Sequence, residues 1–390
     1  MNVLNSLLRK SPSTESMITK LKYDAGKDWI AVFTHDATRT GAPIIAWNLI
    51  EQLRERYNVA VVSFGDGELT PAFERVASAY CWGASQSDDS LGALASEIAA
   101  LRPVYALVNS IVSTRAVTVL KHHGIRTLSL VHEFAFMQDY AGYIELAKES
   151  DAIIFPAELI KQDFIRAAKT EDRTNFHVFP QGLTVSPDGS SVSEQKRLTD
   201  KFNSFAGEDF VVLGVGYACW RKGTELFIET AAHLKRKHPL LRFKFVWIGY
   251  EGDGCSRVAW GRQIEISGLA DSVLFLGPFQ DTAPAYEMAD VLFVSSRFDP
   301  FPCVAVEAAC AGIPIICFDN ATGFTEFLRQ SNLLSRGIVD YADVAGAASA
   351  LFNLATDADA LASTANQTLS LSRSFDMRKY AEKIDGIARA

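Results

Sequence analysis

The chain of 390 residues alternates short apolar runs with helical patterns almost from end to end, and this alternation constrains its fold most. In the first half, apolar runs predict strands at residues 29–35, 59–64, 105–109, 127–132, 152–155 and 176–179. Patterns at 43–56, 91–101 and 112–123 predict helices between them. Continuous apolar strands separated by helices indicate parallel sheets that helices cover on both faces. The sequence therefore predicts an α/β fold.

The alternation is interrupted once, and the interruption divides the chain. Residues 183–201 are polar and rich in serine, which is typical of a linker. Beyond them, apolar runs predict strands at 210–215, 243–248, 273–276, 291–294 and 315–318. We therefore predict two Rossmann-like domains, at 1–190 and 191–372, and a helix at 373–390 that packs back across the domain junction. Because such sheets bind ligands at the carboxyl ends of their strands, we expect a ligand between the domains.

The segment 295–318, SSRFDPFPCVAVEAACAGIPIICF, carries the strongest functional signal. Asp299 precedes a predicted helix, and Glu307 lies within this helix among small and apolar residues. A carboxylate in such surroundings costs several kcal/mol unless it finds partners. Both carboxylates can face one crevice, together with the free amides of Cys303 and Val304 at the helix start, where phosphate binds favourably. The alternative is a structural Glu307 bonded to a neighbouring backbone or to a lysine.

Two other loops combine features that suit a diphosphate. Arg221 and Lys222 follow a predicted strand and precede a helix, so two cations stand at a strand end. Gly41 and Ala42 lie at the start of the first long helix, where bare backbone can approach a phosphate closely. The structural alternatives are a basic helix cap on the surface and a plain tight turn.

These motifs resemble the retaining GT-B glycosyltransferases of the family-4 type, also called glycosyl transferases group 1. The signature of that family is an acidic residue, seven residues, a glutamate, a small-residue helix and G-x-P. Here it is Asp299, Glu307, Gly312 and Pro314, with Asp299 at a position where the family usually has Glu. The resemblance spans residues 29–380 and implies two domains that face each other across a cleft.

The resemblance also implies roles for individual residues. Glu307 would hold the ribose hydroxyls of a nucleotide, and Asp299 would hold hydroxyls of the transferred sugar. Lys222 would neutralise the leaving diphosphate, and Arg221 would replace an arginine that the family often has. Residues expected to contact the donor are Gly41, Ala42, Gly249, Pro278, Phe279, Phe301, Cys303, Val304 and Glu307. Those expected to be catalytic are Lys222, Arg221, His132 and Asp299, although a lone histidine at a strand end is more often structural.

The function that the resemblance implies is a retaining, metal-independent transfer of a sugar from a nucleotide-diphosphate sugar to an acceptor. The acceptor would be a glycan or a lipid-linked glycan, in the biosynthesis of a bacterial surface polysaccharide such as O-antigen or capsule. No metal or other cofactor is expected. Two alternatives are an NDP-sugar epimerase with the GT-B fold and a non-catalytic sugar-nucleotide sensor or assembly subunit.

Composition narrows the choice of partners. A net charge of −8 without a long basic stripe argues against nucleic acid. The sequence contains no run of about 18 apolar residues, so no membrane span is predicted. Six cysteines without a C-x-x-C pair fit a reducing compartment. We therefore expect a cytoplasmic protein, with peripheral contact at the inner face of the membrane through its acceptor. For the first residues we expect a frayed leader, with a weak interfacial contact through Leu4, Leu7 and Leu8 as the alternative.

Overall fold

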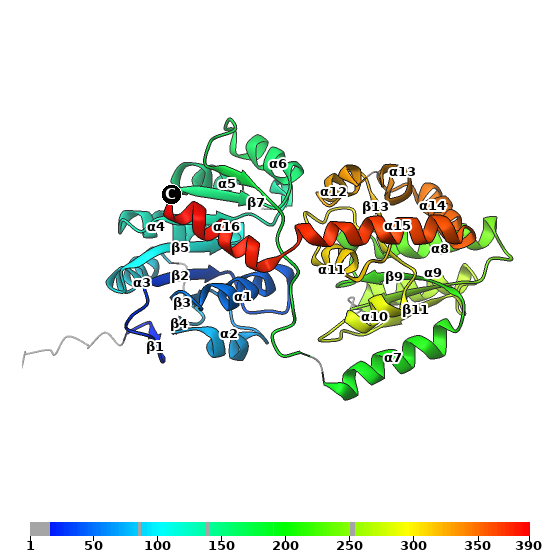
Figure 1. Ribbon diagram of the computed structural model, residues 1–390, viewed down its shortest axis with the longest axis horizontal. Helices are drawn as coiled ribbons and strands as arrows, with labels where there is room; N and C mark the ends of the chain where they lie inside the picture. The colour runs from blue at the N-terminus through cyan, green and yellow to red at the C-terminus, as the bar shows by residue number, and fades with distance from the viewer. Residues whose placement is uncertain (1–15, 85–86, 138–139, 190, 250–253, 332) are drawn as a thin grey trace, which may run out of the picture.

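The computed structural model describes residues 16–390 apart from 85–86, 138–139, 190, 250–253 and 332, so Leu4, Leu7 and Leu8 lie outside the described residues. Two α/β lobes lie side by side, and each is built on its own central sheet (Figure 1). The predicted α/β architecture with two parallel-sheet domains is confirmed.

The first domain is built on an eight-stranded sheet with the order β1-β4-β3-β2-β5-β6-β7-β8, in which only the β1–β4 pair is antiparallel. Its strands are β1 (Thr19–Lys20), β2 (Trp29–Thr34), β3 (Asn58–Ser63), β4 (Ala79–Cys81), β5 (Pro103–Asn109), β6 (Thr127–Leu130), β7 (Ala152–Phe155) and β8 (Phe176–Val178). One face packs against α1 (Gly41–Leu53), α2 (Thr70–Val76) and α16 (Met377–Arg389). The other face packs against α3 (Asp88–Ala100), α4 (Arg115–His122), α5 (Tyr140–Glu149) and α6 (Glu158–Ala168).

The second domain is built on a six-stranded parallel sheet with the order β11-β10-β9-β12-β13-β14. Its strands are β9 (Phe210–Val215), β10 (Phe243–Ile248), β11 (Val273–Leu276), β12 (Val291–Val294), β13 (Ile315–Phe318) and β14 (Ile338–Val339). One face packs against α8 (Thr224–Lys237), α9 (Gly254–Ile266) and α14 (Val344–Thr356). The other face packs against α7 (Val192–Ala206), α10 (Ala283–Met288), α11 (Cys303–Ala311) and α12 (Thr325–Gln330). Two further helices are α13 (Leu334–Gly337) and α15 (Ala358–Leu371).

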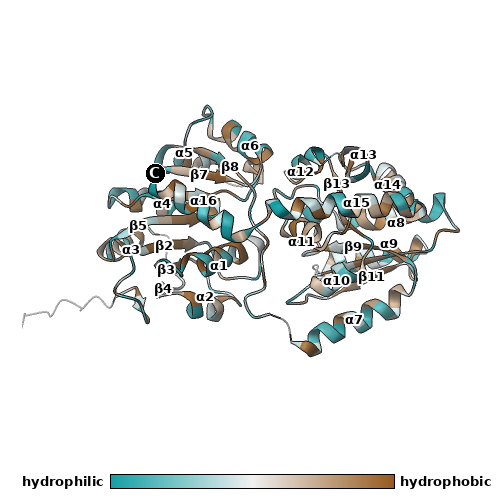
Figure 2. Ribbon diagram, viewed as in Figure 1, coloured by the Kyte–Doolittle hydropathy of each residue, from teal (hydrophilic) through white to brown (hydrophobic). Residues whose placement is uncertain are grey.

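The predicted linker at 183–201 is wrong in its second half, where α7 begins at Val192. The Ser191 hydroxyl caps this helix by accepting a hydrogen bond from the Glu194 amide at 3.1 Å. Leu198, Phe202 and Ala206 recur every four residues and are buried against the sheet. Figure 2 colours most of α7 hydrophilic with short hydrophobic stretches, which is the pattern of an amphipathic surface helix. Its high content of serine and charge hides this sparse periodicity.

The two domains touch through specific contacts as well as through the connecting chain. The Glu326 carboxylate of α12 accepts hydrogen bonds from the backbone amides of Glu158 and Leu159, at 3.0 and 2.8 Å. A Cβ on Gly323 would lie only 2.3 Å from the Cβ of Ala157, so the domains meet here at a distance that only glycine allows. The last helices also bridge the domains, because α15 lies on the second lobe and α16 on the first (Figure 1).

Candidate active site

The strand order of each sheet brings the predicted site residues to one place. In the first sheet, β3 and β4 lie on one side of β2 and β5 to β8 on the other, so the strand order switches between β2 and β5. In the second sheet, β10 and β11 lie on one side of β9 and β12 to β14 on the other, so the order switches between β9 and β12. Lys222 follows β9 and Asp299 follows β12, the two strands that flank the second switch point. Ligands of open α/β sheets bind at this position, outside the carboxyl ends of the strands.

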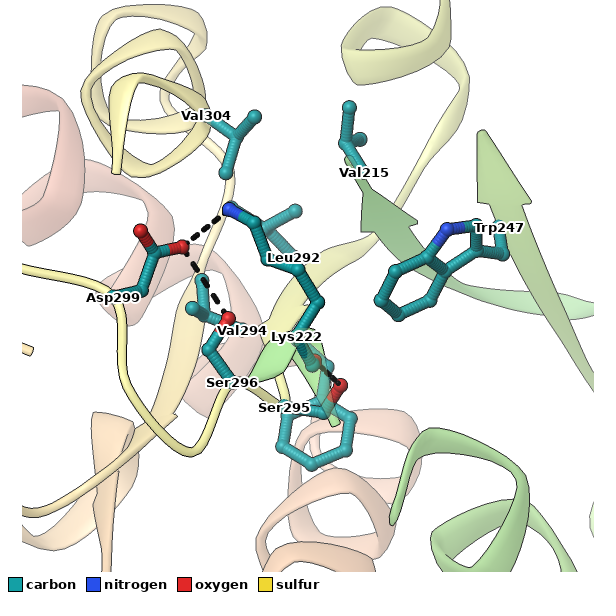
Figure 3. Close-up of a pocket in the computed structure, with 10 residues that line it drawn as sticks. Val215, Lys222, Trp247, Leu292, Val294, Ser295, Ser296, Asp299 and Val304 are labelled. Carbon is teal, nitrogen blue, oxygen red and sulfur yellow. Dashed lines mark hydrogen bonds and ion pairs between the residues drawn. The ribbon is translucent and has the colours of Figure 1, made fainter. Parts of the chain in front are cut away.

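Lys222 and Asp299 form a buried ion pair at this switch point (Figure 3). The Lys222 Nζ lies 2.5 Å from Asp299 Oδ2, and the Arg221 Nη1 lies 3.5 Å from Asp299 Oδ1. The Ser296 hydroxyl donates to Asp299 Oδ2 at 3.3 Å. Burial by itself raises the pKa of the Asp299 carboxyl, but Lys222 and Arg221 outweigh burial and hold this pKa below its usual value. The site therefore holds two cations and one ionised carboxylate.

A glycine sets the position of the lysine. Lys222 ends a short 3-10 helix, η3 (Trp220–Lys222), and Gly223 follows it with φ of +65°. A Cβ on Gly223 would lie 1.9 Å from the Ser295 carbonyl oxygen, so no other residue fits without displacing the backbone. This close approach holds the loop after β9 against the end of β12, and therefore holds Lys222 beside Asp299.

Two helix N-termini from different domains meet next to this pair. The start of α11 lies against the start of α1, since a Cβ on Gly41 would be 3.8 Å from the Cys303 sulfur. The Gln181 amide group donates to Cys303 Sγ and to the Phe301 carbonyl oxygen, both at 3.3 Å. Burial raises the pKa of the Cys303 thiol to about 12, so this thiol is neutral. The free amides of both helices offer partial positive charge to an anion.

Glu307 lies one turn further along α11 and is held by a tyrosine from α10. The Tyr286 hydroxyl donates to Glu307 Oε2 at 2.7 Å. Burial raises the pKa of Glu307, while the Tyr286 hydrogen bond and the charge of Lys222 lower it by less. The charge of Lys222 therefore acts on Glu307 as it does on Asp299, and Tyr286 orients one oxygen of the Glu307 side chain. Sequence reasoning missed Tyr286, because a tyrosine 21 residues before Glu307 carries no local signal.

The first domain contributes a hydrogen-bond chain at its own strand ends. His132 Nε2 lies 2.9 Å from Asn109 Oδ1, and the Asn109 amide group donates to the Ala42 carbonyl oxygen at 2.9 Å. Burial lowers the pKa of His132, which favours the neutral imidazole. Its Nδ1 is buried, and no residue that the structure describes bonds to it. Ser110 adopts φ of +76°, an unusual conformation for serine, and its hydroxyl donates to Glu133.

The remaining predicted donor contacts occupy three different environments. Gly249 lies against Gly216, where an added Cβ would be 2.8 Å from the Gly216 carbonyl oxygen. Pro278 is exposed, and the Arg197 guanidinium lies 4.7 Å from the centre of the Phe279 ring. A loop between β11 and α10 is thus supported by α7.

Phe301, also a predicted donor contact, packs with its side chain in an apolar cluster. The side chain is 6% exposed. Its ring lies against Phe324, Phe327 and Phe375, at 5.7, 5.6 and 6.2 Å between centroids. This apolar cluster joins the site loop to the end of the chain, because Phe375 lies just before α16.

A small crevice opens beside the ion pair, between Lys222, Val304 and the ends of the strands (Figure 3). Its volume of about 10 Å³ has room for about one water molecule, so the crevice by itself does not hold a nucleotide. Within the described residues, no group of three or more His, Cys, Asp or Glu side chains could hold a metal ion. No helix in this part of the chain is long and apolar enough to cross a membrane.

Solved structures share this fold over nearly the whole chain. The structure of HepE from Anabaena in complex with UDP superimposes with a TM-score of 0.76, at 16% identity, over 92% of this chain and 98% of that one. Sucrose-phosphate synthase from Thermosynechococcus elongatus gives a TM-score of 0.71, at 17% identity, over 93% and 98% of the two chains. The chain therefore has the GT-B fold, with two Rossmann-like domains.

The sequence comparisons match one part of the chain to a family. Residues 209–357 match the family described as Glycosyl transferases group 1. The Bacillus subtilis protein EpsD, which is named as a glycosyltransferase, is 27% identical over 242 residues, which cover 57% of this chain and 59% of EpsD. The second domain therefore matches the group 1 glycosyltransferases, the family that its sequence motifs resemble. A second relative, EpsF of Bacillus subtilis, is covered over 40% of its length, so the chain aligns with about half the length of these relatives.

Proposed function

We propose that this protein is a retaining, metal-independent glycosyltransferase that moves a sugar from a nucleoside-diphosphate sugar to a glycan or lipid-linked glycan. The main supporting observation is that Lys222 and Arg221 both pair with Asp299 at the switch point of the second sheet. Val304, in the first turn of α11, lines the same crevice as Lys222 and Asp299. Such a cluster stabilises the charge that develops on a departing diphosphate. Glu307 is available to the ribose hydroxyls, and Asp299 to hydroxyls of the transferred sugar.

In the proposed reaction, the bond between the sugar and the diphosphate breaks first, and the acceptor hydroxyl attacks the same face of the sugar. The departing phosphate oxygen takes the proton of the acceptor, so no protein nucleophile is required. Neutral His132 would donate its Nε2–H to Asn109 Oδ1, which leaves Nδ1 unprotonated. The buried Nδ1 could accept a hydrogen bond only from a sugar hydroxyl that reaches into the site. Closure of the domains would exclude water and so limit hydrolysis.

Relatives support the proposed donor and pathway. HepE is described in complexes with UDP and with UDP-glucose. The Salmonella typhi protein VipC/TviE, named for Vi polysaccharide biosynthesis, is 30% identical over 108 residues, which cover 28% of this chain and 18% of that protein. We therefore propose a role in the synthesis of a surface polysaccharide, in the cytoplasm and peripheral to the inner face of the membrane.

The test combines a binding screen with a turnover assay. UDP-, GDP- and ADP-sugars are screened for thermal stabilisation, and the stabilising donor is then incubated in labelled form with and without acceptor glycans. Lys222→Ala should abolish transfer while the fold is kept, whereas the exposed Lys196→Ala on α7 should leave transfer unchanged. Unchanged turnover in Lys222→Ala would refute the catalytic assignment. Release of free nucleotide without an acceptor would favour the epimerase, and binding without turnover would favour a sensor.

A further inference from the structure

Aromatic side chains from four separate segments gather beside the Lys222–Asp299 pair. We call this group the aromatic platform, and it consists of Phe134, Phe136, Trp220, Phe298 and Tyr341. Phe298 lies at its centre, with ring centroids 4.7 Å from Phe136, 6.0 Å from Trp220 and 6.0 Å from Tyr341. Phe134 and Phe136 come from the first domain and the others from the second, so the aromatic platform spans the domain junction.

Three rings of the aromatic platform are exposed to solvent. Trp220 is 60% exposed, Phe136 is 48% exposed and Tyr341 is 45% exposed, while Phe134 is buried beneath them at 4%. Contiguous exposed apolar surface of this kind usually marks a place where a ligand or partner binds. The exposed rings at the domain junction are therefore a candidate binding surface for a ligand.

The position of the platform indicates which substrate that occupant belongs to. Phe298 directly precedes Asp299, and Trp220 directly precedes Arg221 and Lys222. A ligand on these rings therefore lies next to the atoms proposed to bind the transferred sugar and its diphosphate. The donor nucleotide is expected on the other side, toward Glu307 and the loop of Phe279. The acceptor, which is the substrate that receives the sugar, is then expected at the aromatic platform.

The chemistry of the platform suits a pyranose ring. One face of a pyranose presents only C–H groups, which pack on the electron-rich faces of Trp, Tyr and Phe. A charged pair borders the platform, because the Arg297 guanidinium lies 4.7 Å from the Trp220 ring centre and pairs with Glu225. These groups can bond the hydroxyls at the edge of a sugar. A polyprenyl chain would gain nothing from them and would leave their charges facing hydrocarbon.

We propose that the aromatic platform is the acceptor subsite and binds a pyranose ring of the acceptor glycan by stacking. This inference rests on the proposed function and specifies its second substrate. Because the rings come from both domains, the subsite is complete only when the domains meet, so acceptor binding favours the closed arrangement in which Phe136 touches Phe298.

The test measures sugar binding directly and does not require the natural acceptor. Methyl glycosides of glucose, galactose, mannose and N-acetylglucosamine are examined by saturation-transfer NMR with irradiation of the aromatic protons of the protein. The nucleoside diphosphate that stabilises the protein most is present throughout. At least one glycoside should receive saturation, mainly at the C–H protons of one face. The double variant Phe136→Leu/Trp220→Leu should raise its dissociation constant about tenfold.

Two controls show whether the aromatic rings themselves bind the sugar. Leucine keeps an apolar side chain at both positions but removes the aromatic ring, and the thermal midpoint checks that the fold is intact. Tyr23→Leu removes an aromatic ring that is 52% exposed beside β1, and should leave binding unchanged. Saturation of no glycoside, or equal saturation in the double variant, would overturn the inference. Saturation of n-octanol but of no glycoside would overturn it as well and assign the platform to a lipid chain. Nucleotide binding reports on the proposed function independently, since the donor nucleotide is expected toward Glu307 and away from the platform.

Discussion

Asp299 forms ion pairs with Lys222 and Arg221, the two cations that the donor diphosphate is expected to bind. Removal of the Asp299 charge should therefore tighten the binding of nucleoside diphosphates. In the free protein, Lys222 Nζ lies 2.5 Å from Asp299 Oδ2, so an incoming diphosphate must share or displace this carboxylate. An intact sugar donor offers hydroxyls to Asp299, whereas the product nucleotide offers none. We therefore expect Asp299→Asn to bind the product more tightly and to turn over more slowly.

The size of the effect follows from the charges. Two unit charges about 5 Å apart repel each other by about 3 kcal/mol at an effective dielectric constant of about 20. Because the Arg221 side chain is 35% exposed and salt screens the site, we expect about half of this repulsion energy to affect binding. The dissociation constant should then be roughly 10- to 30-fold lower. The gain should shrink as ionic strength rises.

Isothermal titration calorimetry with UDP, GDP and ADP measures this difference. Asp200→Asn is the matched control, because Asp200 pairs with Lys196 on the surface of α7 at 2.7 Å, away from the site. An unchanged or weaker affinity in Asp299→Asn, together with normal binding by the wild type, would refute the reasoning. The failure of every nucleotide to bind either protein would refute the proposed function instead.

Further predictions concern the supports of the site and the response to pH. The Tyr286 hydrogen bond lowers the pKa of Glu307, so its loss in Tyr286→Phe should raise this pKa further. In binding titrations against pH, the loss of nucleotide affinity in acid should then begin at a higher pH. The same pH dependence in variant and wild type would exclude this role of Tyr286. Asp299 has a lowered pKa, so its ionisation stabilises the fold above a pH of about 4 and this stability is lost as the pH falls through the folded pKa. Acid unfolding of Asp299→Asn should lack that component. Gly223→Ala should cost about 2–3 kcal/mol in urea denaturation, and a cost near zero would contradict the close contact with Ser295. Asp385→Ala should cost about 3 kcal/mol and speed amide exchange in α16, because two tyrosine hydroxyls bond to this buried carboxylate; exchange as slow as in the wild type would count against that anchor.

Local pattern determined most of the fold. Strands β9 to β13 begin and end at the predicted residues, because each is a continuous apolar run bounded by polar loops. The strands that the sequence missed, β1, β4 and β14, are two or three residues long and make too short a pattern to recognise. The helix α7 was missed for a related reason, since its buried residues Leu198, Phe202 and Ala206 are few among many polar ones.

The sequence by itself also identified the chemical groups of the site, since Asp299, Glu307 and the Arg221–Lys222 pair stand at the ends of recognisable elements. Which groups touch was decided only by the tertiary structure. Lys222 and Asp299 are 77 residues apart, and they meet because β9 and β12 are neighbours in the sheet. The Tyr286–Glu307 bond, the burial of Phe301 and the aromatic platform depend likewise on how separate segments pack. Periodicity records which face of an element is buried, but it carries no information on which other element covers that face.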